Sequence, residues 1–153
     1  MGVERIEHCV DMTLRGRKFK KVTEHWYRSM RTKYGLKQME IDILYYISQR
    51  DHGVTAKEIS NDLVANKGQV SIALDNLVKM HYLQEKPDEK DKRMAHFYLT
   101  KEAEPLLIDH QKRAQEMRDY MCKNISNEEI LQFVPLMEKL IANMDAMLEE
   151  QLK

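Results

Sequence analysis

TAKEISNDLVANKGQVSIALDNLVKM, residues 55–80, is the stretch that decides the fold, because it contains two short helices in close succession. Thr55 and Glu58 form a capping box, in which a hydroxyl and a carboxylate satisfy unpaired N–H groups at a helix start, so a helix to about Leu63 is predicted. Asn66, three residues before Gln69, predicts a second cap and a helix over about 67–80. Two capped helices joined this tightly indicate a helix-turn-helix.

The second of these helices has an apolar stripe and a polar end. Val70, Leu74, Leu77 and Val78 recur at helical spacing and predict its buried face. The end that enters a major groove carries Lys67, Gly68, Gln69, Ser71 and Ile72. There a Lys side chain can reach guanine acceptors and a Gln side chain adenine, while glycine permits close approach of the backbone. Phosphate contacts are expected from Thr55, Lys57 and Asn66.

A β-hairpin follows directly. Residues 82–86 (YLQEK) and 94–99 (MAHFYL) flank the polar loop 87–93 (PDEKDKR), and the second segment alternates with the period of two of a half-buried strand. The hairpin is predicted to be a wing. The expected fold class is therefore mainly α with a small β-hairpin wing (α+β), with a winged helix-turn-helix DNA-binding lobe over residues 36–100.

Long amphipathic segments lie on both sides of this lobe. Residues 4 to about 33 are predicted to form one helix, with Gly16 as an alternative break, and 37–50 a second. Helical spacing returns from 101 to about 123, and a capping box at Ser126 begins a last helix to about 150. Their stripes are longer than the lobe needs, so residues 1–34 and 101–153 are interpreted as dimerisation helices of a single domain, 1–153. Packing of these helices within one chain is the alternative.

Charge and composition exclude several classes of protein. The net charge is zero, yet residues 15–33 carry eight cations and one anion, while 101–153 carry seven cations and eleven anions. The basic run is either a solvated helix face or a set of phosphate contacts. The sequence has no membrane span, leader, phosphate-binding glycine loop, nucleophile motif or paired carboxylates, so a cytoplasmic protein that is not an enzyme and needs no cofactor is expected.

Three motifs in this order of elements resemble the MarR family of bacterial transcription regulators. They are Gln69-Val70-Ser71 followed by Leu74 and Leu77, Asp91-Lys92-Arg93 in the wing, and Leu99-Thr100 at its end. The chain departs from the family pattern at His81 and Ala103, where Gly is usual, at Lys92, where a second wing Arg is usual, and at Ile72, where Arg is frequent. His81 is expected to adopt a left-handed conformation.

The resemblance implies a homodimer whose N-terminal and last two helices interlock. Two recognition helices would then lie about 34 Å apart on double-stranded DNA with a pseudo-palindromic operator. Arg93 would enter the minor groove, braced by Asp91, with Lys92 beside it. The expected function is that of a dimeric sequence-specific DNA-binding transcription regulator. A repressor that a small-molecule effector releases from DNA is expected, and an activator is the less frequent alternative.

The signal to which such a regulator responds, and the residues that detect it, are open to several interpretations. An effector pocket lined by Trp26, Met39, Tyr45 and Tyr46 fits the family arrangement, although these side chains suit a core equally well. Cys9 corresponds to a redox cysteine of some relatives, whereas an inert core thiol is the plainer interpretation. The six histidines form no tight ligand pair, so no metal site is expected. The alternatives are a redox- or zinc-responsive regulator of the same fold and a winged-helix protein-interaction module.

Overall fold

The computed structural model describes residues 12–151. Its contacts divide the chain into two compact units, residues 1–115 (unit 1) and 116–153 (unit 2). Cys9, the candidate redox residue, lies outside the described residues. The helices among the described residues include none that is long and apolar enough to cross a membrane.

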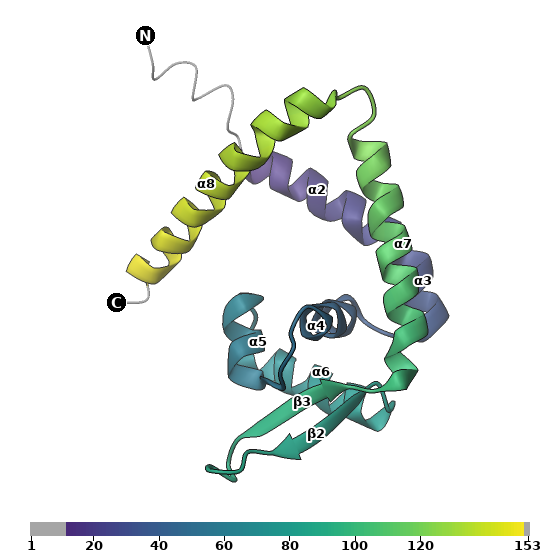
Figure 1. Ribbon diagram of the computed structural model, residues 1–153, viewed down its shortest axis with the longest axis vertical. Coiled ribbons are helices and arrows are strands. Elements are labelled where there is room, and N and C mark those ends of the chain that lie inside the picture. Colours follow the sequence, from purple (N-terminus) through teal and green to yellow (C-terminus); the bar gives the residue numbers. More distant parts are fainter. Residues whose placement is uncertain (1–11, 152–153) are drawn as a thin grey trace. The chain divides into compact units, whose positions relative to one another are not determined.

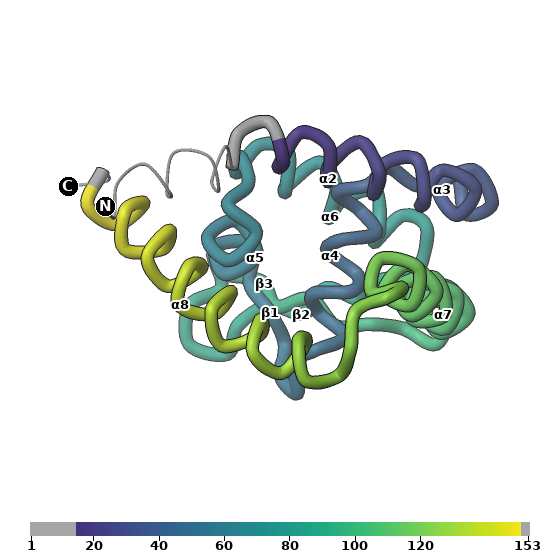
Figure 2. Tube along the Cα trace, turned by 90° about the horizontal axis from the view of Figure 1, so that it is seen from above, coloured from purple at the N-terminus to yellow at the C-terminus, as the bar shows by residue number. Residues whose placement is uncertain are grey.

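Unit 1 contains a group of helices with a small sheet at its edge (Figures 1 and 2). In chain order its elements are α2 (Met12–Trp26), α3 (Arg28–Tyr34), α4 (Gln38–Ser48), β1 (Val54–Thr55), α5 (Ala56–Asp62), α6 (Lys67–Lys79), β2 (Leu83–Pro87), β3 (Ala95–Leu99), the 3-10 turn η1 (Lys101–Ala103) and the first turns of α7 (Glu104–Met121). The sheet is antiparallel in the order β1-β3-β2. The predicted mainly helical fold with a β-hairpin wing is confirmed.

The N-terminal helical segment is interrupted at Tyr27 and not at Gly16. Gly16 lies within α2, whereas Tyr27 separates α2 from α3 with ψ near 1°. Tyr27 is buried and its ring stacks on His110 of α7, 5.2 Å between centroids. α3 ends at Gly35, whose φ of +66° is the left-handed cap that glycine adopts without strain. The break therefore coincides with a tertiary contact that local propensity does not reveal.

The core of unit 1 lies between the helix-turn-helix and the helix before it. Fully buried side chains come from α4, α5 and α6, among them Leu44, Ile59 and Leu74. Leu83 of β2 and Phe97 of β3 are buried as well, and this extends the core to the sheet. Both predicted caps are present: Thr55 accepts from the N–H of Glu58, and Asn66 accepts from the N–H groups of Gly68 and Gln69.

The two-residue strand β1 was not predicted from sequence. It pairs Val54 with Phe97 and Thr55 with His96, and so places the start of α5 against the wing. A strand this short has no alternation to detect. His81, between α6 and β2, has the expected left-handed conformation, with φ of +62°.

A buried carboxylate connects α4 to α6. Glu40, only 3% exposed, accepts hydrogen bonds from the backbone N–H of Lys37 at 2.6 Å and from the amide Nδ2 of Asn76 at 2.8 Å. Glu40 thereby caps α4 and also fixes the orientation of α6.

Replacing Glu40 with alanine is expected to lower the free energy of unfolding by about 1–3 kcal/mol, because two part-buried donors lose their acceptor. Glu40→Gln, which keeps an oxygen for Asn76, should cost less. Urea denaturation measures both variants, and equal losses would contradict the role of the Asn76 contact.

Unit 2 contains the end of α7 and the long helix α8 (Asn127–Gln151). The predicted capping box at its start is confirmed: the Ser126 N–H donates to the carboxylate of Glu129, and the Glu129 N–H donates to the Ser126 hydroxyl. No residue of α8 within 127–150 is buried. Its large exposed apolar side chains are Leu131, Phe133, Val134, Leu136, Ile141, Met144, Met147 and Leu148.

Candidate nucleic-acid interface

The N-terminal end of α6 presents an exposed face of mixed chemistry. Val70, Ala73 and Leu74 are buried, whereas the residues between and before them are exposed. The exposed set is Lys67, Gly68, Gln69, Ser71 and Ile72. The cap fixes this end, because the Asn66 side-chain oxygen lies 2.9 Å from the N–H nitrogen of Gly68 and 3.4 Å from that of Gln69. A helix N-terminus held in this way also offers a positive dipole to an anionic backbone.

The expectation for Thr55 needs correction. Thr55 is buried, and its hydroxyl donates to Glu58 Oε2 at 2.7 Å while also accepting from the Glu58 N–H. Because both functions of the hydroxyl are used within the cap, Thr55 positions α5 and does not face a phosphate. Lys57 and Asn66, in contrast, are exposed.

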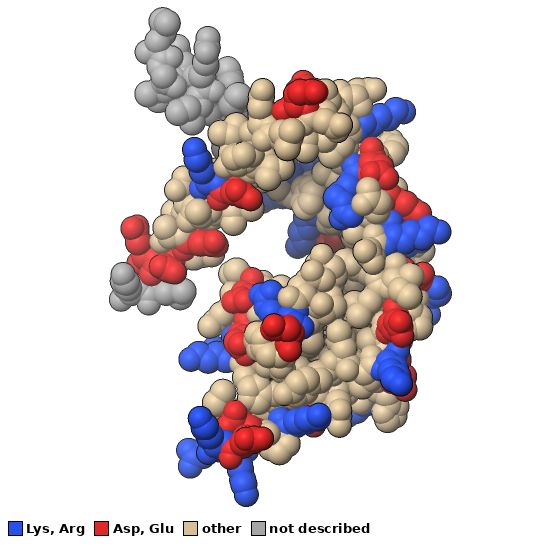
Figure 3. Space-filling model, in the orientation of Figure 1, with Lys and Arg blue, Asp and Glu red and all other residues tan. Residues whose placement is uncertain are grey.

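The loop of the wing is organised by two aspartates. Asp88 Oδ1 accepts from the backbone N–H groups of Lys90 and Asp91 at 2.7 and 2.8 Å, and Asp91 Oδ1 accepts from the N–H of Arg93 at 3.0 Å. Asp91 thus contacts the backbone of Arg93 and orients this exposed arginine through its main chain. At the tip of the hairpin anionic and cationic side chains mix, and cationic groups reach outermost (Figure 3).

His96 connects this loop to the segment before α5, a role that the sequence analysis missed. Its Nε2 lies 2.9 Å from Asp88 Oδ2, and its Nδ1 lies 3.0 Å from the carbonyl oxygen of Gly53. Both partners are acceptors, so only the doubly protonated imidazolium donates to both. The hydrogen bond to Asp88, followed by that to Gly53, raises the pKa of His96. The backbone donors of the turn, together with His96, lower the pKa of Asp88 to about 2.

Stability is therefore expected to depend on pH through His96. Because its folded-state pKa lies above the ordinary 6.5, the contribution of His96 is complete below pH 6.5 and is lost as pH rises through the raised pKa. The difference in melting temperature between the wild type and His96→Gln should be largest in mild acid and should shrink at alkaline pH. His25→Gln, at an exposed histidine of α2, is the control; a pH-independent difference for His96→Gln would contradict the prediction.

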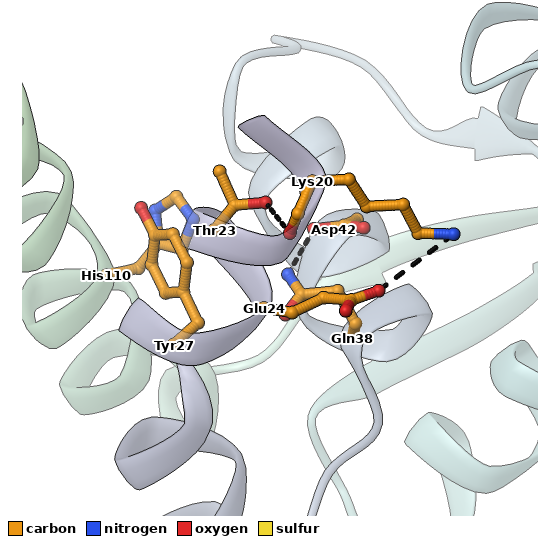
Figure 4. A pocket seen from close by; sticks show the side chains of 7 residues that line it. All are labelled: Lys20, Thr23, Glu24, Tyr27, Gln38, Asp42 and His110. Atoms are coloured by element: carbon orange, nitrogen blue, oxygen red, sulfur yellow. Dashed lines mark hydrogen bonds and ion pairs between the residues drawn. The ribbon is translucent and has the colours of Figure 1, made fainter. Parts of the chain in front are cut away.

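A hollow of about 370 Å³ lies between α2, α4 and α7 in unit 1. Figure 4 shows His110 against the Tyr27 ring on one side, and the Lys20–Glu24 ion pair and the Gln38–Asp42 hydrogen bond on the other. Thr23 completes the lining. Burial lowers the pKa of His110 and raises that of Asp42. His110 Nδ1 is buried, and no described residue offers it a hydrogen bond.

The four predicted effector-pocket residues do not line this hollow. Trp26 Nε1 donates to the carbonyl of Arg113, which ties α2 to α7. Tyr46 donates to Asp62 at 2.6 Å and so connects α4 to α5. Met39 lines a separate hollow beside Gln69 and Ile72 of α6. Only Tyr45 is adjacent, with its ring 4.4 Å from that of His110. Aromatic composition alone did not distinguish packing residues from lining residues.

The basic run of the first helices does not lie with the recognition face. In Figure 1, α2 is at the opposite end of unit 1 from the tip of the β2–β3 hairpin. Lys33 of α3 is paired with Asp109 of α7, a contact that Tyr34 shares by donating to the same carboxylate oxygen. Lys33 thereby holds α3 beside the first turns of α7 (Figures 1 and 2), while Arg31 donates to Gln38 and to the carbonyl of Glu24.

Residues 36–103 match a family described as winged helix DNA-binding domain. No curated protein matches the chain by sequence.

Among solved structures, a MarR protein from Peptoclostridium difficile is 19% identical, with a TM-score of 0.82 over 91% of this chain and 90% of that one. S. aureus MepR in its DNA-binding conformation is 18% identical, with a TM-score of 0.77 over 88% of this chain and 99% of its own. A MarR transcriptional regulator from Methanosarcina mazei is 22% identical, with a TM-score of 0.70 over 86% and 99%. The chain therefore has the winged-helix fold that is found in MarR-type regulators.

Proposed function

We propose that this chain, which carries a winged helix DNA-binding domain and shares its fold with MarR-type regulators, is itself a MarR-family transcription regulator. In the proposed function a homodimer binds a pseudo-palindromic operator in double-stranded DNA and represses a neighbouring gene until an effector releases it. The chain acts by binding and not by catalysis, in the compartment that holds the DNA, the cytoplasm.

The observation that carries the proposal is the exposed, capped end of α6. Lys67, Gln69 and Ser71 project from it and are of the types that read base edges in the major groove. On the wing Lys92 and Arg93 are exposed, and the turn built on Asp88 and Asp91 fixes the backbone that carries them. We assign Arg93 to the minor groove and Lys57 and Asn66 to phosphates.

The proposed dimer is supported by the exposed apolar side chains of α8. In α8 Leu131 is 73% exposed and Leu136 63%, and Tyr120 in the last turn of α7 is 73% exposed. Contiguous apolar surface of this kind marks an interaction site. A second copy of the same surface would cover it and would bring two α6 helices to one duplex, as a two-fold symmetric operator requires.

We propose the hollow beside His110 as the effector site. Its volume is in the range of small-molecule pockets, and it has an aromatic wall at Tyr27 and an unpaired buried nitrogen at His110. α4 carries Asp42 into the hollow, while Glu40 on the same helix bonds Asn76 of α6. A ligand that moves α4 therefore moves the recognition helix directly.

The experiment that tests the function is a gel shift on the DNA upstream of the chain's own gene, repeated at rising salt. Retention that weakens steeply with salt, and that Arg93→Ala reduces while Lys112→Ala on α7 leaves it unchanged, is the expected result. A protein-interaction module would show neither specific retention nor an effect of Arg93→Ala, and that outcome would refute DNA-binding function.

The effector site is tested separately with a panel of small aromatic compounds that carry one hydrogen-bonding group. A compound that releases DNA from the wild type should fail to release it from His110→Phe, which keeps the ring and removes the nitrogen. Release that is unchanged in this variant would place the effector elsewhere.

A further inference from the structure

Ile72 is an exposed aliphatic side chain in the middle of a polar recognition face. It is 66% exposed, one helical turn beyond Gln69 on α6. Gln69 and Ile72 line the same shallow hollow between α6 and the start of α4, so they share one side of the helix. A branched aliphatic side chain at this position forms no hydrogen bonds with water, and its burial against an apolar group would be favourable.

The chemistry of Ile72 favours a base edge over the DNA backbone. Asp75 lies on the next turn and lines a second hollow with Ile72, together with Lys37 and Lys79. These charges of opposite sign offset one another, so they do not make the hollow a phosphate site. Ile72 itself has no hydrogen-bonding group to offer a phosphate.

The major groove offers an aliphatic side chain one apolar group. Thymine presents its 5-methyl group there, whereas the other three bases present donors and acceptors and no methyl group. A contact between Ile72 and any other base would bury an acceptor or a donor against hydrocarbon at a cost. The chemistry of the exposed side chain therefore selects the base.

We propose that Ile72 is a specificity-determining residue that reads the methyl group of one thymine in each half-site, next to the base pair that Gln69 contacts. The inference rests on the proposed DNA-binding function. It adds to that function a base requirement at a defined place in the operator.

The test removes the methyl group alone. Duplexes selected by the wild-type chain from a pool with a randomised core supply the recognition sequence, and deoxyuridine then replaces each thymine in turn. At one thymine position, replacement in a single half-site should lower affinity about fourfold, as expected for loss of one buried methyl group. Replacement at that position in both half-sites should lower affinity about fifteenfold. In Ile72→Ala, binding should already be weaker, and the same replacement should have no further effect.

Val64→Ala is the matched control, because Val64 is also aliphatic and 70% exposed but lies outside α6, in the turn before it. This variant should still discriminate thymine from uracil. Wild-type protein that binds both duplexes equally, or Ile72→Ala that still discriminates, would overturn the inference while DNA binding itself stands. Failure to retain any duplex at low salt would instead refute the proposed function. Thermal unfolding of each variant shows that its fold is intact.

Discussion

Replacing both Phe133 and Met144 of α8 with glutamate should convert the protein to a monomer and should weaken binding to the selected operator at least about thousandfold. The two residues are eleven positions apart, three turns of helix, so they lie on the same face. They are 58% and 50% exposed in the single chain.

The size of this effect follows from two terms. Two charges on each copy would have to be buried at the interface, and unpaired buried charge is strongly destabilising. A monomer then engages one half-site and keeps affinity close to the non-specific level, because specific affinity requires both recognition helices on one duplex. The substitutions leave every residue of α6 and of the wing unchanged, so the loss of affinity is expected to arise from assembly.

Analytical ultracentrifugation and fluorescence anisotropy measure the two consequences. The control is Ala142→Glu with Ala146→Glu, which adds the same charges on the opposite face of α8 and should leave the dimer intact. Circular dichroism confirms that unit 1 remains folded. A Phe133/Met144 variant that stays dimeric would show that this face of α8 is not the dimer interface. A wild type that is itself monomeric would instead support the alternative, packing of these helices within one chain.

Gln69→Ala is the single substitution in unit 1 with the largest expected effect on DNA binding. Gln69 is exposed in the first turn of the capped end of α6, and its amide can bond both adenine N6 and N7. Each such pair contributes about 1–3 kcal/mol of discrimination, so the two half-sites together should lose roughly thirtyfold or more in affinity.

The loss should be confined to specific binding. Affinity for a scrambled duplex and the slope of affinity against salt should change little, because the phosphate contacts remain. Gln111→Ala, at an exposed glutamine of α7, is the control. An equal loss of affinity on specific and scrambled duplexes would mean that Gln69 contacts the backbone and not a base.

The sequence was sufficient to predict those structural features that depend on residues close together in the chain. The capping boxes at Thr55 and Ser126 and the cap at Asn66 depend on residues within three positions of each other, and the structure contains all three. The left-handed conformation at His81 was predicted on the same grounds. The buried face of α6 follows from helical periodicity, which also leaves Gln69 and Ile72 exposed.

Other features depend on partners distant in the chain, and only the tertiary structure decided them. Glu40 meets Asn76 36 positions later, and His96 meets Gly53 43 positions earlier. Thr55 was expected at a phosphate because its neighbours in space were unknown, and pairing with β3 buries it. Trp26 and Tyr46 were grouped with an effector pocket by their type, and the structure adds hydrogen bonds by which each connects two helices.

The 26 residues quoted at the start thus determined the helix-turn-helix by themselves, because capping and amphipathic periodicity act within one or two helical turns. They also determined which side chains of α6 face outward. The tertiary structure decided how that face is held, through Glu40 between α4 and α6 and through His96 between the wing and the start of α5. Burial and long-range hydrogen bonding depend on chain segments whose proximity no local pattern encodes.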